Sequence, residues 1–236
     1  MVSRHCLCAL VVGAVLTVNG CAPTTPVADN SQRSNEAPSD PQDQGPPSRS
    51  NPLHDLPAAA LQAWGDAGGT QRAWIQFGIY GSVYWTDDSH ATVDDIPAFV
   101  FVNGVHIHAE QPLPDPGIPF GVIIRGSENP DRDIAEFVKY APHENLVALD
   151  LRLNALTDSG VKELTRLSKL QALSLRQTGI TDEMLAEVES MKELTRLDVG
   201  DASSAKKDGS LTEKGIAHIG KLPKLAYLNL TGSGVK

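Results

Sequence analysis

The chain has 236 residues, of which 41% are hydrophobic, and its formal net charge is -9 at pH 7. This length allows one large domain or two small ones. The acidic balance argues against a nucleic-acid partner, because phosphate binding relies on a basic surface that displaces counterions.

The first 21 residues indicate a secretory signal. Arg4 provides a positive start, and residues 7–18 form an apolar run shorter than the roughly 20 residues of a membrane span. The sequence Val18-Asn19-Gly20-Cys21 follows, and it resembles the lipobox of bacterial lipoproteins. The resemblance implies a lipid on Cys21 and a lipid-anchored protein of the bacterial cell envelope, at the outer membrane or facing the periplasm. The alternative is an ordinary cleaved signal that contains a cysteine.

All three cysteines lie within these 21 residues. After cleavage before Cys21, the mature chain would hold a single cysteine and could form no internal disulfide.

Residues 22–51 are predicted to form a disordered linker. They contain six prolines, one valine and no aromatic residue. Such a segment cannot bury enough apolar surface to offset its ordering entropy. It would hold the folded part away from the membrane as an extended tether.

Residues 52–145 are less regular. A short helix is predicted at 56–64, with Pro57 at its first position and glycines after its end. Strands are predicted at 74–80, 98–108 and 121–124.

The array that follows begins its blocks at Leu146, Leu170, Leu194 and Leu225, with periods of 24, 24 and 31 residues. In each block the first, fourth and sixth residues are apolar. These residues are Leu146, Leu149 and Leu151; Leu170, Leu173 and Leu175; Leu194, Leu197 and Val199; and Leu225, Leu228 and Leu230. The last two of each set alternate with polar residues, as in a half-buried strand.

A helix is predicted after each of the first three strands of the array. Thr157, Thr181 and Thr212 each precede an acidic residue, and this pair suits a helix N-terminus. Apolar residues then recur three apart on one face. They are Val161, Leu164 and Leu167; Leu185, Val188 and Met191; and Ile216, Ile219 and Leu222. Stacking of neighbouring repeats would bury them in one core.

This pattern resembles the leucine-rich repeats of ribonuclease-inhibitor-like type. It is similar to the arrays of bacterial secreted proteins and lipoproteins, planctomycete ones among them. The resemblance covers residues 146–235 and implies an α/β solenoid, with a curved parallel sheet inside and helices outside. It implies binding of a partner, not catalysis, and no cofactor.

The same template can be laid over the middle region. It matches Ile96, Phe99 and Phe101; Pro119, Val122 and Ile124; and Trp74, Phe77 and Ile79. Ile134, Phe137 and Tyr140 predict an outer helix, for which Asn129, Asp131 or Asp133 could be the cap. One interpretation is an N-terminal cap with degenerate repeats in one continuous solenoid. The other is a separate small α+β domain, because four prolines at 112–119 interrupt the pattern.

The inner face of the array is the predicted binding surface. The residues predicted to bind a partner are Asp150, Arg152, Ser174, Arg176, Arg196, Asp198, Tyr227 and Asn229. Exposed Arg and Tyr are frequent anchors of interfaces. The alternative is that these polar side chains only solvate the sheet. The insertion at 203–210 brings Lys206 and Lys207, which either contact an acidic partner or are solvated.

Catalytic and metal sites are not supported. His106, His108 and Glu110 alternate along a predicted strand, and histidines at this spacing can bind zinc, but no further ligand follows at a recognisable spacing. The acidic loop at 87–95 lacks the Asp-x-Asp-x-Asp-Gly frame of a calcium loop. No Gly-x-Ser-x-Gly motif occurs.

Three functions follow as hypotheses. The first is a non-catalytic, lipid-anchored envelope protein that binds a protein or glycan through the inner face of its repeats. The second is a structural envelope protein that self-assembles through its C-terminal repeat, because no helix is predicted after the last strand to cover its core face. The alternative explanation of that open face is that the chain is a shortened version of a longer array. The third is a metal-dependent hydrolase that uses the middle region.

Overall fold

The computed structural model describes residues 56–68, 71–77, 83–86, 95–105, 107, 112–200 and 211–235. The predicted signal, Cys21 and the predicted linker lie outside these residues. The helices are α1 (Ala58–Asp66), α2 (Pro130–Tyr140), α3 (Asp158–Leu164), α4 (Asp182–Val188) and α5 (Glu213–Ile219). The strands are β1 (Gln71–Phe77), β2 (Val83–Thr86), β3 (Ile96–Val102), β4 (Phe120–Arg125), β5 (Leu146–Asp150), β6 (Ala172–Ser174), β7 (Arg196–Asp198) and β8 (Tyr227–Asn229).

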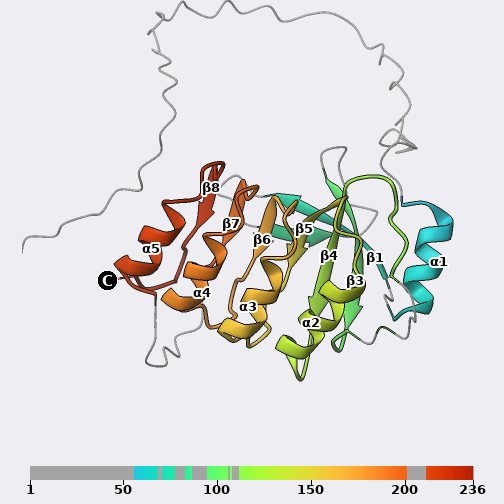
Figure 1. Ribbon diagram of the computed structural model, residues 1–236. Coiled ribbons are helices and arrows are strands. Elements are labelled where there is room, and N and C mark those ends of the chain that lie inside the picture. Colours follow the sequence, from blue (N-terminus) through green and yellow to red (C-terminus); the bar gives the residue numbers. More distant parts are fainter. Residues whose placement is uncertain are drawn as a thin grey trace, which may run out of the picture. The chain divides into compact units, whose positions relative to one another are not determined.

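One sheet runs through the described strands in the order β2-β1-β3-β4-β5-β6-β7-β8 (Figure 1). Every neighbouring pair from β3 to β8 is parallel. The central apolar residue of each repeat is in register along the sheet, as Phe99, Val122, Leu149, Leu173, Leu197 and Leu228. The predicted fold class, an α/β leucine-rich repeat solenoid with helices on one face of a curved sheet, is confirmed.

The turns after the strands also repeat. In each repeat, we consider the residue that stands two positions after the last apolar residue of the template. Wherever the structure describes this residue, its φ is positive and its backbone lies in the left-handed region. The residues there are Asn103, Gly126, Leu153, Gln177 and Gly232. The template therefore holds over β3 and β4, where the sequence is least regular.

The template is wrong at Trp74, Phe77 and Ile79. Strand β1 pairs antiparallel with both β2 and β3, so it is the inner strand of a hairpin and not a repeat. The error has a simple cause: alternating apolar residues are the same signature in parallel and antiparallel strands. Ile79 itself lies outside the described residues.

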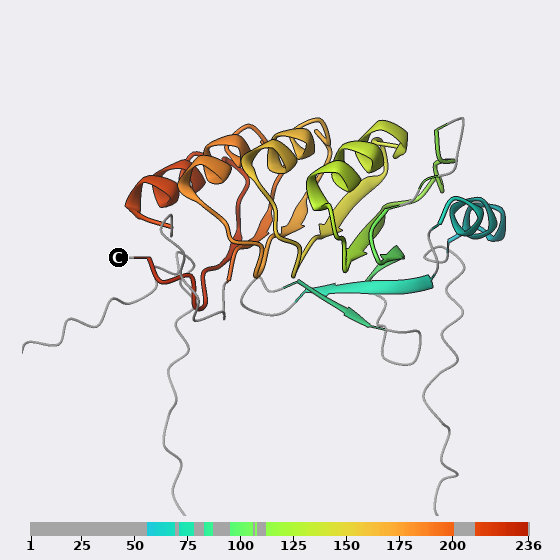
Figure 2. The ribbon, with the colours of Figure 1, turned by 90° about the horizontal axis from the view of Figure 1, so that it is seen from below.

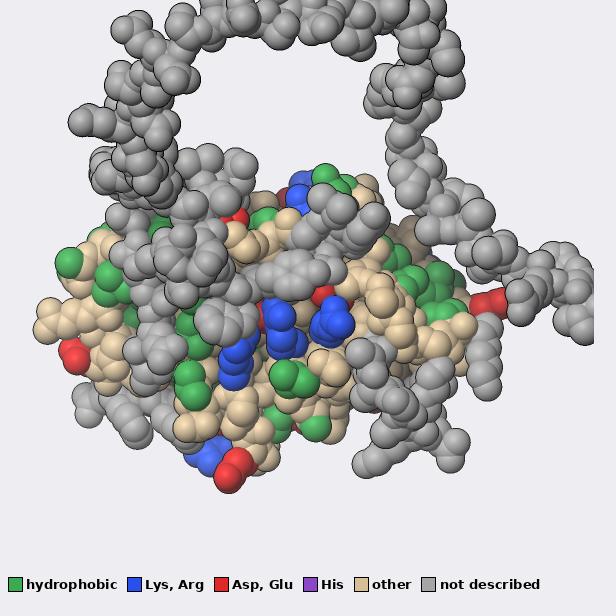
Figure 3. Space-filling view, turned by 180° about the vertical axis from the view of Figure 1, so that it is seen from behind, with side chains coloured by type: hydrophobic (Ala, Val, Ile, Leu, Met, Phe, Trp, Pro, Cys, Tyr) green, Lys and Arg blue, Asp and Glu red, His purple; other side chains and the backbone are tan. Residues whose placement is uncertain are grey.

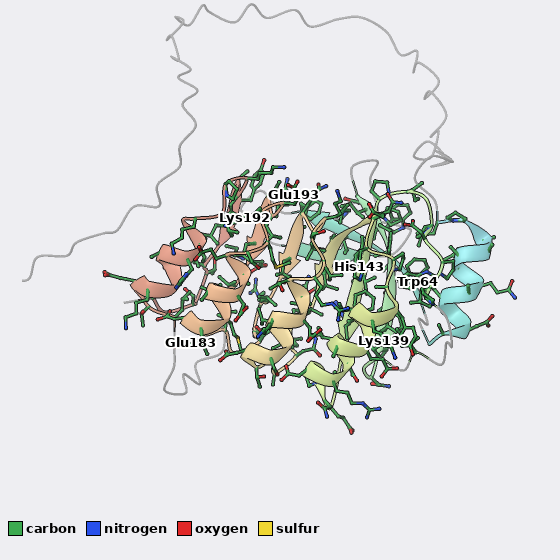
Figure 4. The ribbon with its side chains drawn as sticks, viewed as in Figure 1. Trp64, Lys139, His143, Glu183, Lys192 and Glu193 are labelled. Carbon is green, nitrogen blue, oxygen red and sulfur yellow. The ribbon has the colours of Figure 1, made fainter. Side chains whose placement is uncertain are left out.

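Helix α1 covers the N-terminal end of the core. Its Trp64 is fully buried, and its ring stacks on Phe99 at 4.0 Å between centroids and meets Phe120 edge-on at 5.4 Å. The indole Nε1 donates to the carbonyl of Pro114 at 2.9 Å. Figure 4 shows Trp64 between α1 and the strands. A buried indole with a satisfied N–H anchors α1 to the first repeat strand.

The core of the array lies between the strands and α2–α5, which line one face of the sheet (Figure 2). The predicted apolar residues of the first three regular repeats are buried, from Leu146 to Leu222, except Ile216, which is partly buried. In the fourth repeat Leu225, Leu228 and Leu230 are only partly buried. Each full burial contributes about 1.5–3 kcal/mol.

The predicted helix caps are confirmed for three threonines. The hydroxyl of Thr157 accepts from Ser159 N at 3.3 Å, and those of Thr181 and Thr212 accept in the same way from the first turns of α4 and α5. These bonds satisfy amide groups that a helix leaves without intrahelical partners.

The cap predicted for α2 is different from the one observed. Asn129 stands at the cap position but its side chain makes no capping bond. Asp133 instead accepts from Val105 N at 3.1 Å and from Ser127 Oγ at 2.6 Å. Asp131 reaches the next repeat, where Thr157 N donates to it at 3.0 Å. Both carboxylates therefore accept hydrogen bonds from neighbouring segments and do not cap α2 itself.

Candidate binding surface on the strand face

Each repeat strand turns alternate side chains toward the side of the sheet opposite the helices, which we call the strand face. The structure aligns these side chains in columns. The first column is Ala98, Gly121, Ala148, Ala172, Arg196 and Tyr227, and the second is Val100, Ile123, Asp150, Ser174, Asp198 and Asn229. Residues two further along form a third, with Val102, Arg125, Arg152, Arg176, Gly200 and Thr231. The strand face is thus apolar toward β3 and polar toward β8.

The β1–β2 hairpin packs on the apolar part of the strand face. Figure 2 shows β1 crossing the sheet on the side away from the helices. A second buried cluster forms there, with Ala73, Ile75, Ala98, Val100, Ile123, Ala148 and Ala172. The N-terminal part of the inner face is therefore a core and not an open binding surface.

Part of the predicted binding surface is also buried. Asp150, Ser174 and Asp198 have no exposed area, and Asn229 is 4% exposed. The side chains of this polar column are therefore buried. The prediction that they are presented to a partner is corrected, and they do not solvate the sheet either. Asp150, Asp198 and Asn229 each accept from the backbone N–H two residues further along, at 3.0–3.1 Å, so these buried side chains are bonded within their own turns. These bonds hold the turn after each strand.

Asp150 is also half of a buried ion pair. Arg152 Nε donates to both carboxylate oxygens of Asp150, at 2.7 and 2.9 Å, and Arg152 Nη2 lies 2.7 Å from Oδ2. Such multidentate pairing is the strongest way to hold a carboxylate. Arg152 is therefore committed to Asp150, although its side chain remains 16% exposed.

Arg125 occupies the position of Arg152 one repeat earlier, and sequence reasoning missed it. Burial lowers the pKa of Arg125, and the carboxylate of Asp150 acts against that effect. Extending the template by one residue beyond Ile124 would have found it. Arg125, Arg152 and Arg176 form what we call the arginine row. Figure 3 shows basic side chains grouped side by side on this face of the molecule.

Arg176 differs from the other two arginines of the row. It is half-buried, and among the described residues its side chain takes part in no hydrogen bond or ion pair. Ser174 stands two residues before it, and the Ser174 hydroxyl is buried without a hydrogen-bond partner. Both groups lie on the strand face of β6 or directly after it.

Arg196 and Tyr227 lie at the other end of the polar part. The Arg196 guanidinium is 3.8 Å from the ring centroid of Tyr227 and 4.6 Å from that of Phe77. It thus stacks against both the last strand and the hairpin. Tyr227 is 40% exposed. The role of Phe77 was not predicted, because nothing in its local sequence indicates that the hairpin reaches β7.

Several candidate residues lie outside the described part of the chain. They are His106, His108, Glu110, Asp87, Asp88, His90, Asp94, Lys206 and Lys207. Asp95 is described, buried, and accepts from Gln76 at 2.9 Å. Within the described residues no group of His, Cys, Asp and Glu is arranged to hold a metal ion. No helix in that same part has the length and apolarity needed to cross a membrane.

Comparison with known proteins agrees with this geometry. The family model described as Leucine Rich repeat matches residues 143–164, which span β5 and α3. Neither a curated protein nor a solved structure matches the chain. Together, the match and the curved, largely parallel sheet support a leucine-rich repeat protein.

Proposed function

We propose that this protein is a non-catalytic, lipid-anchored envelope protein that binds a protein partner through the polar part of its strand face. Leucine-rich repeats commonly act as protein-interaction scaffolds, and this chain contains such repeats. The observation that carries the proposal is the accessibility of Arg176, Arg196 and Tyr227, three interface-type side chains beside the buried hairpin contact.

The rigidity of this region supports the proposal. The backbone of β5, β6 and β7 is held by parallel pairing on both sides, and polar side chains beneath the surface are bonded to it. Side chains that project from such a scaffold lose little further freedom when a partner binds.

Photo-crosslinking tests the position of the interface. The full chain would carry p-benzoylphenylalanine in place of Tyr227 and be expressed in the native envelope. Adducts are expected from this position and should disappear with Arg176→Glu. The same probe in place of the exposed Lys162 on α3 is the control. Equal adduct formation from the helix position would contradict a strand-face interface.

The envelope location rests on the lipobox-like segment that ends at Cys21. Metabolic labelling with a radioactive fatty acid is expected to mark the wild-type chain, and Cys21→Ser should remove the label and release the protein from membranes. Cys8→Ser, within the apolar run, is the matched control. Label on the Cys21→Ser chain would show that this cysteine is not the anchor.

Self-association is a second candidate function, favoured by the partial burial of Leu225, Leu228 and Leu230. Sedimentation velocity over a range of concentrations distinguishes it from partner binding. A concentration-dependent larger species that Leu228→Gln removes would support it. A glycan partner is the remaining alternative, and adducts on glycan but not on protein would identify it in the crosslinking experiment.

A further inference from the structure

We infer that Arg176 is a carboxylate-binding subsite, and that the protein partner is recognised through an Asp or Glu side chain placed there. The inference rests on the proposed binding function, because it names the chemistry of the partner at that same surface.

The neighbouring repeat provides the pattern for this subsite. On β5, the residue two before Arg152 is Asp150, and the two side chains form a closed ion pair. On β6, the residue two before Arg176 is Ser174, so the repeat brings a guanidinium without the carboxylate that pairs with it. A carboxylate from a partner would restore at β6 the pairing that β5 makes within the chain.

The backbone at Arg176 is held in place by hydrogen bonds to both neighbouring repeats. Its carbonyl accepts from Leu153 N at 3.0 Å, and Gln177 N donates to Gly200 at 3.1 Å, so the parallel ladder continues past β6 on both sides. Side chains two residues apart along such a strand share one face. Ser174 and Arg176 therefore project from the same side of the sheet.

Ser174 is also the exception in its column of buried polar side chains. It has no exposed area and no hydrogen-bond partner, whereas Asp150 and Asp198 in the same column are bonded. A buried hydroxyl without a partner costs stability, and buried polar groups are normally bonded. Because the Ser174 side chain is also neutral, it supplies no negative charge that could pair with the half-exposed Arg176 guanidinium.

The surrounding charge favours an acidic ligand. In the described part of β4 to β7 and the turns after them, the strand face bears the arginines at 125, 152, 176 and 196 against the aspartates at 150 and 198. Asp150 is paired with Arg152, and Asp198 Oδ1 accepts from Gly200 N at 3.1 Å. The local excess of positive charge is opposite to the net charge of the chain, -9.

The test begins with selection of peptides from a random display library on the full chain. The enriched peptides are expected to share an Asp or Glu residue. Changing that residue to Asn or Gln should weaken binding about tenfold or more, as loss of a charge-assisted hydrogen bond does. Arg176→Gln in the protein should cause the same loss, and combining the two changes should cause little more.

Two substitutions at Ser174 make the test specific. Ser174→Asp places a carboxylate before Arg176 as in the neighbouring repeat, and it should abolish peptide binding while the chain stays folded. Ser174→Asn fills similar space without charge and should bind more strongly than Ser174→Asp. Ser174→Ala should bind peptides as the parent does, because the buried hydroxyl does not reach the partner, and its melting temperature should be unchanged or higher.

Arg166→Gln is the control, since Arg166 lies on the helix side and its ion pair with Glu163 is exposed. Enriched peptides that lack an acid, or that bind Arg176→Gln as tightly as the parent, would overturn the carboxylate subsite. If those peptides still depend on Tyr227, the proposed binding function stands. If no peptide depends on Tyr227, Arg196 or Arg176, both proposals fail.

Discussion

At the scale of single residues, an acid in the first turn of one helix holds the cap of the next helix. Asp182 accepts from Thr212 N at 2.8 Å and from Thr212 Oγ1 at 2.5 Å. Asp131 bonds Thr157 in the same way. Between these two pairs, Asp158 meets Thr181 only at 3.4 Å. Asp158 and Asp182, which follow the capping threonines and were predicted to suit the helix dipole, also join consecutive repeats, and so does Asp131, a predicted cap of α2.

The hydrogen bonds that Asp182 accepts from Thr212, which we call the Asp182 bridge, make the stability of the chain depend on pH. Burial alone would raise the pKa of Asp182, but hydrogen bonds from Thr212 and Gly215 outweigh it and lower that pKa. A lowered folded-state pKa contributes stability above the range in which an unfolded Asp titrates, and this contribution is lost as pH falls through the folded value. Asp182→Asn should therefore reduce the free energy of unfolding at pH 7.

The difference between the parent and Asp182→Asn should begin to shrink below about pH 4, where the unfolded Asp takes up a proton, and should disappear only below the lowered folded-state pKa. Denaturant titrations at several pH values measure it. Asp158→Asn is the control and should have a smaller effect, because its contact with Thr181 is long. A difference that grows on acidification would contradict the bridge.

Glycine makes room for this bridge. A Cβ at Gly160 would overlap the carboxylate of Asp131, and one at Gly215 would lie 2.5 Å from Asp182 Oδ1. The equivalent residue in the repeat with the long contact is Met184. Close acid–threonine contact and a glycine three residues after the threonine thus occur together.

Gly160→Ala should cost about 1–2 kcal/mol, because Asp131 must move away and lose its bonds to the Thr157 cap. Gly65→Ala is the matched control. A Cβ there meets nothing within 4 Å, and alanine is the better helix former, so that variant should be neutral or more stable. Chemical denaturation of the two variants measures the contrast, and equal effects would exclude the steric explanation.

At the scale of elements, the β1–β2 hairpin decides how much of the strand face is open. Ile75 is fully buried against the sheet. Its Cδ1 occupies the space in which a Cβ of Gly121 would lie. Gly121 therefore allows the hairpin to approach β4 closely, and the hairpin covers the apolar columns that would otherwise be exposed.

The contact between Ile75 and Gly121 predicts a coupled pair. Gly121→Ala alone should destabilise the chain by about 1–3 kcal/mol through overpacking. Ile75→Val removes the methyl group concerned and should cost about 0.5–1.5 kcal/mol by itself. The double variant should be more stable than the sum of the two losses predicts. Strict additivity in denaturant titrations would show that the hairpin does not pack on β4 in this way.

At the scale of the whole molecule, stability depends on stacking, because no repeat encloses its own apolar residues. Leu173 lies in the middle of the array and has no exposed area. Leu173→Asp would bury a carboxylate without a partner, a cost comparable with the whole stability of a domain. The cooperative thermal transition seen by circular dichroism should be lost.

Leu153→Asp is the control for this prediction. Leu153 is 66% exposed and adopts φ 65°, a conformation that Asp tolerates better than Leu. The control variant should melt as the parent does. If Leu173→Asp also melted as the parent does, the repeats would not share one core.

Much of this molecule follows from local sequence. The period of apolar residues determines the strands and helices of the array. Whether a side chain faces the core or the solvent depends only on its place in that period. Thr157, Thr181 and Thr212 determine where three helices begin, since capping needs only neighbouring groups. The chemistry available for binding is also evident, because Arg176, Arg196 and Tyr227 stand at strand-face positions.

Only the tertiary structure decided which of those positions remain accessible. The direction of β1, the hairpin's place over the strand face and the burial of Asp150, Ser174 and Asp198 all depend on contacts between distant segments. An alternating pattern places a side chain on one face but does not say what covers that face. Among the described residues Arg176 has no hydrogen-bond or ion-pair partner, and this too depends on which distant side chains the fold brings near it.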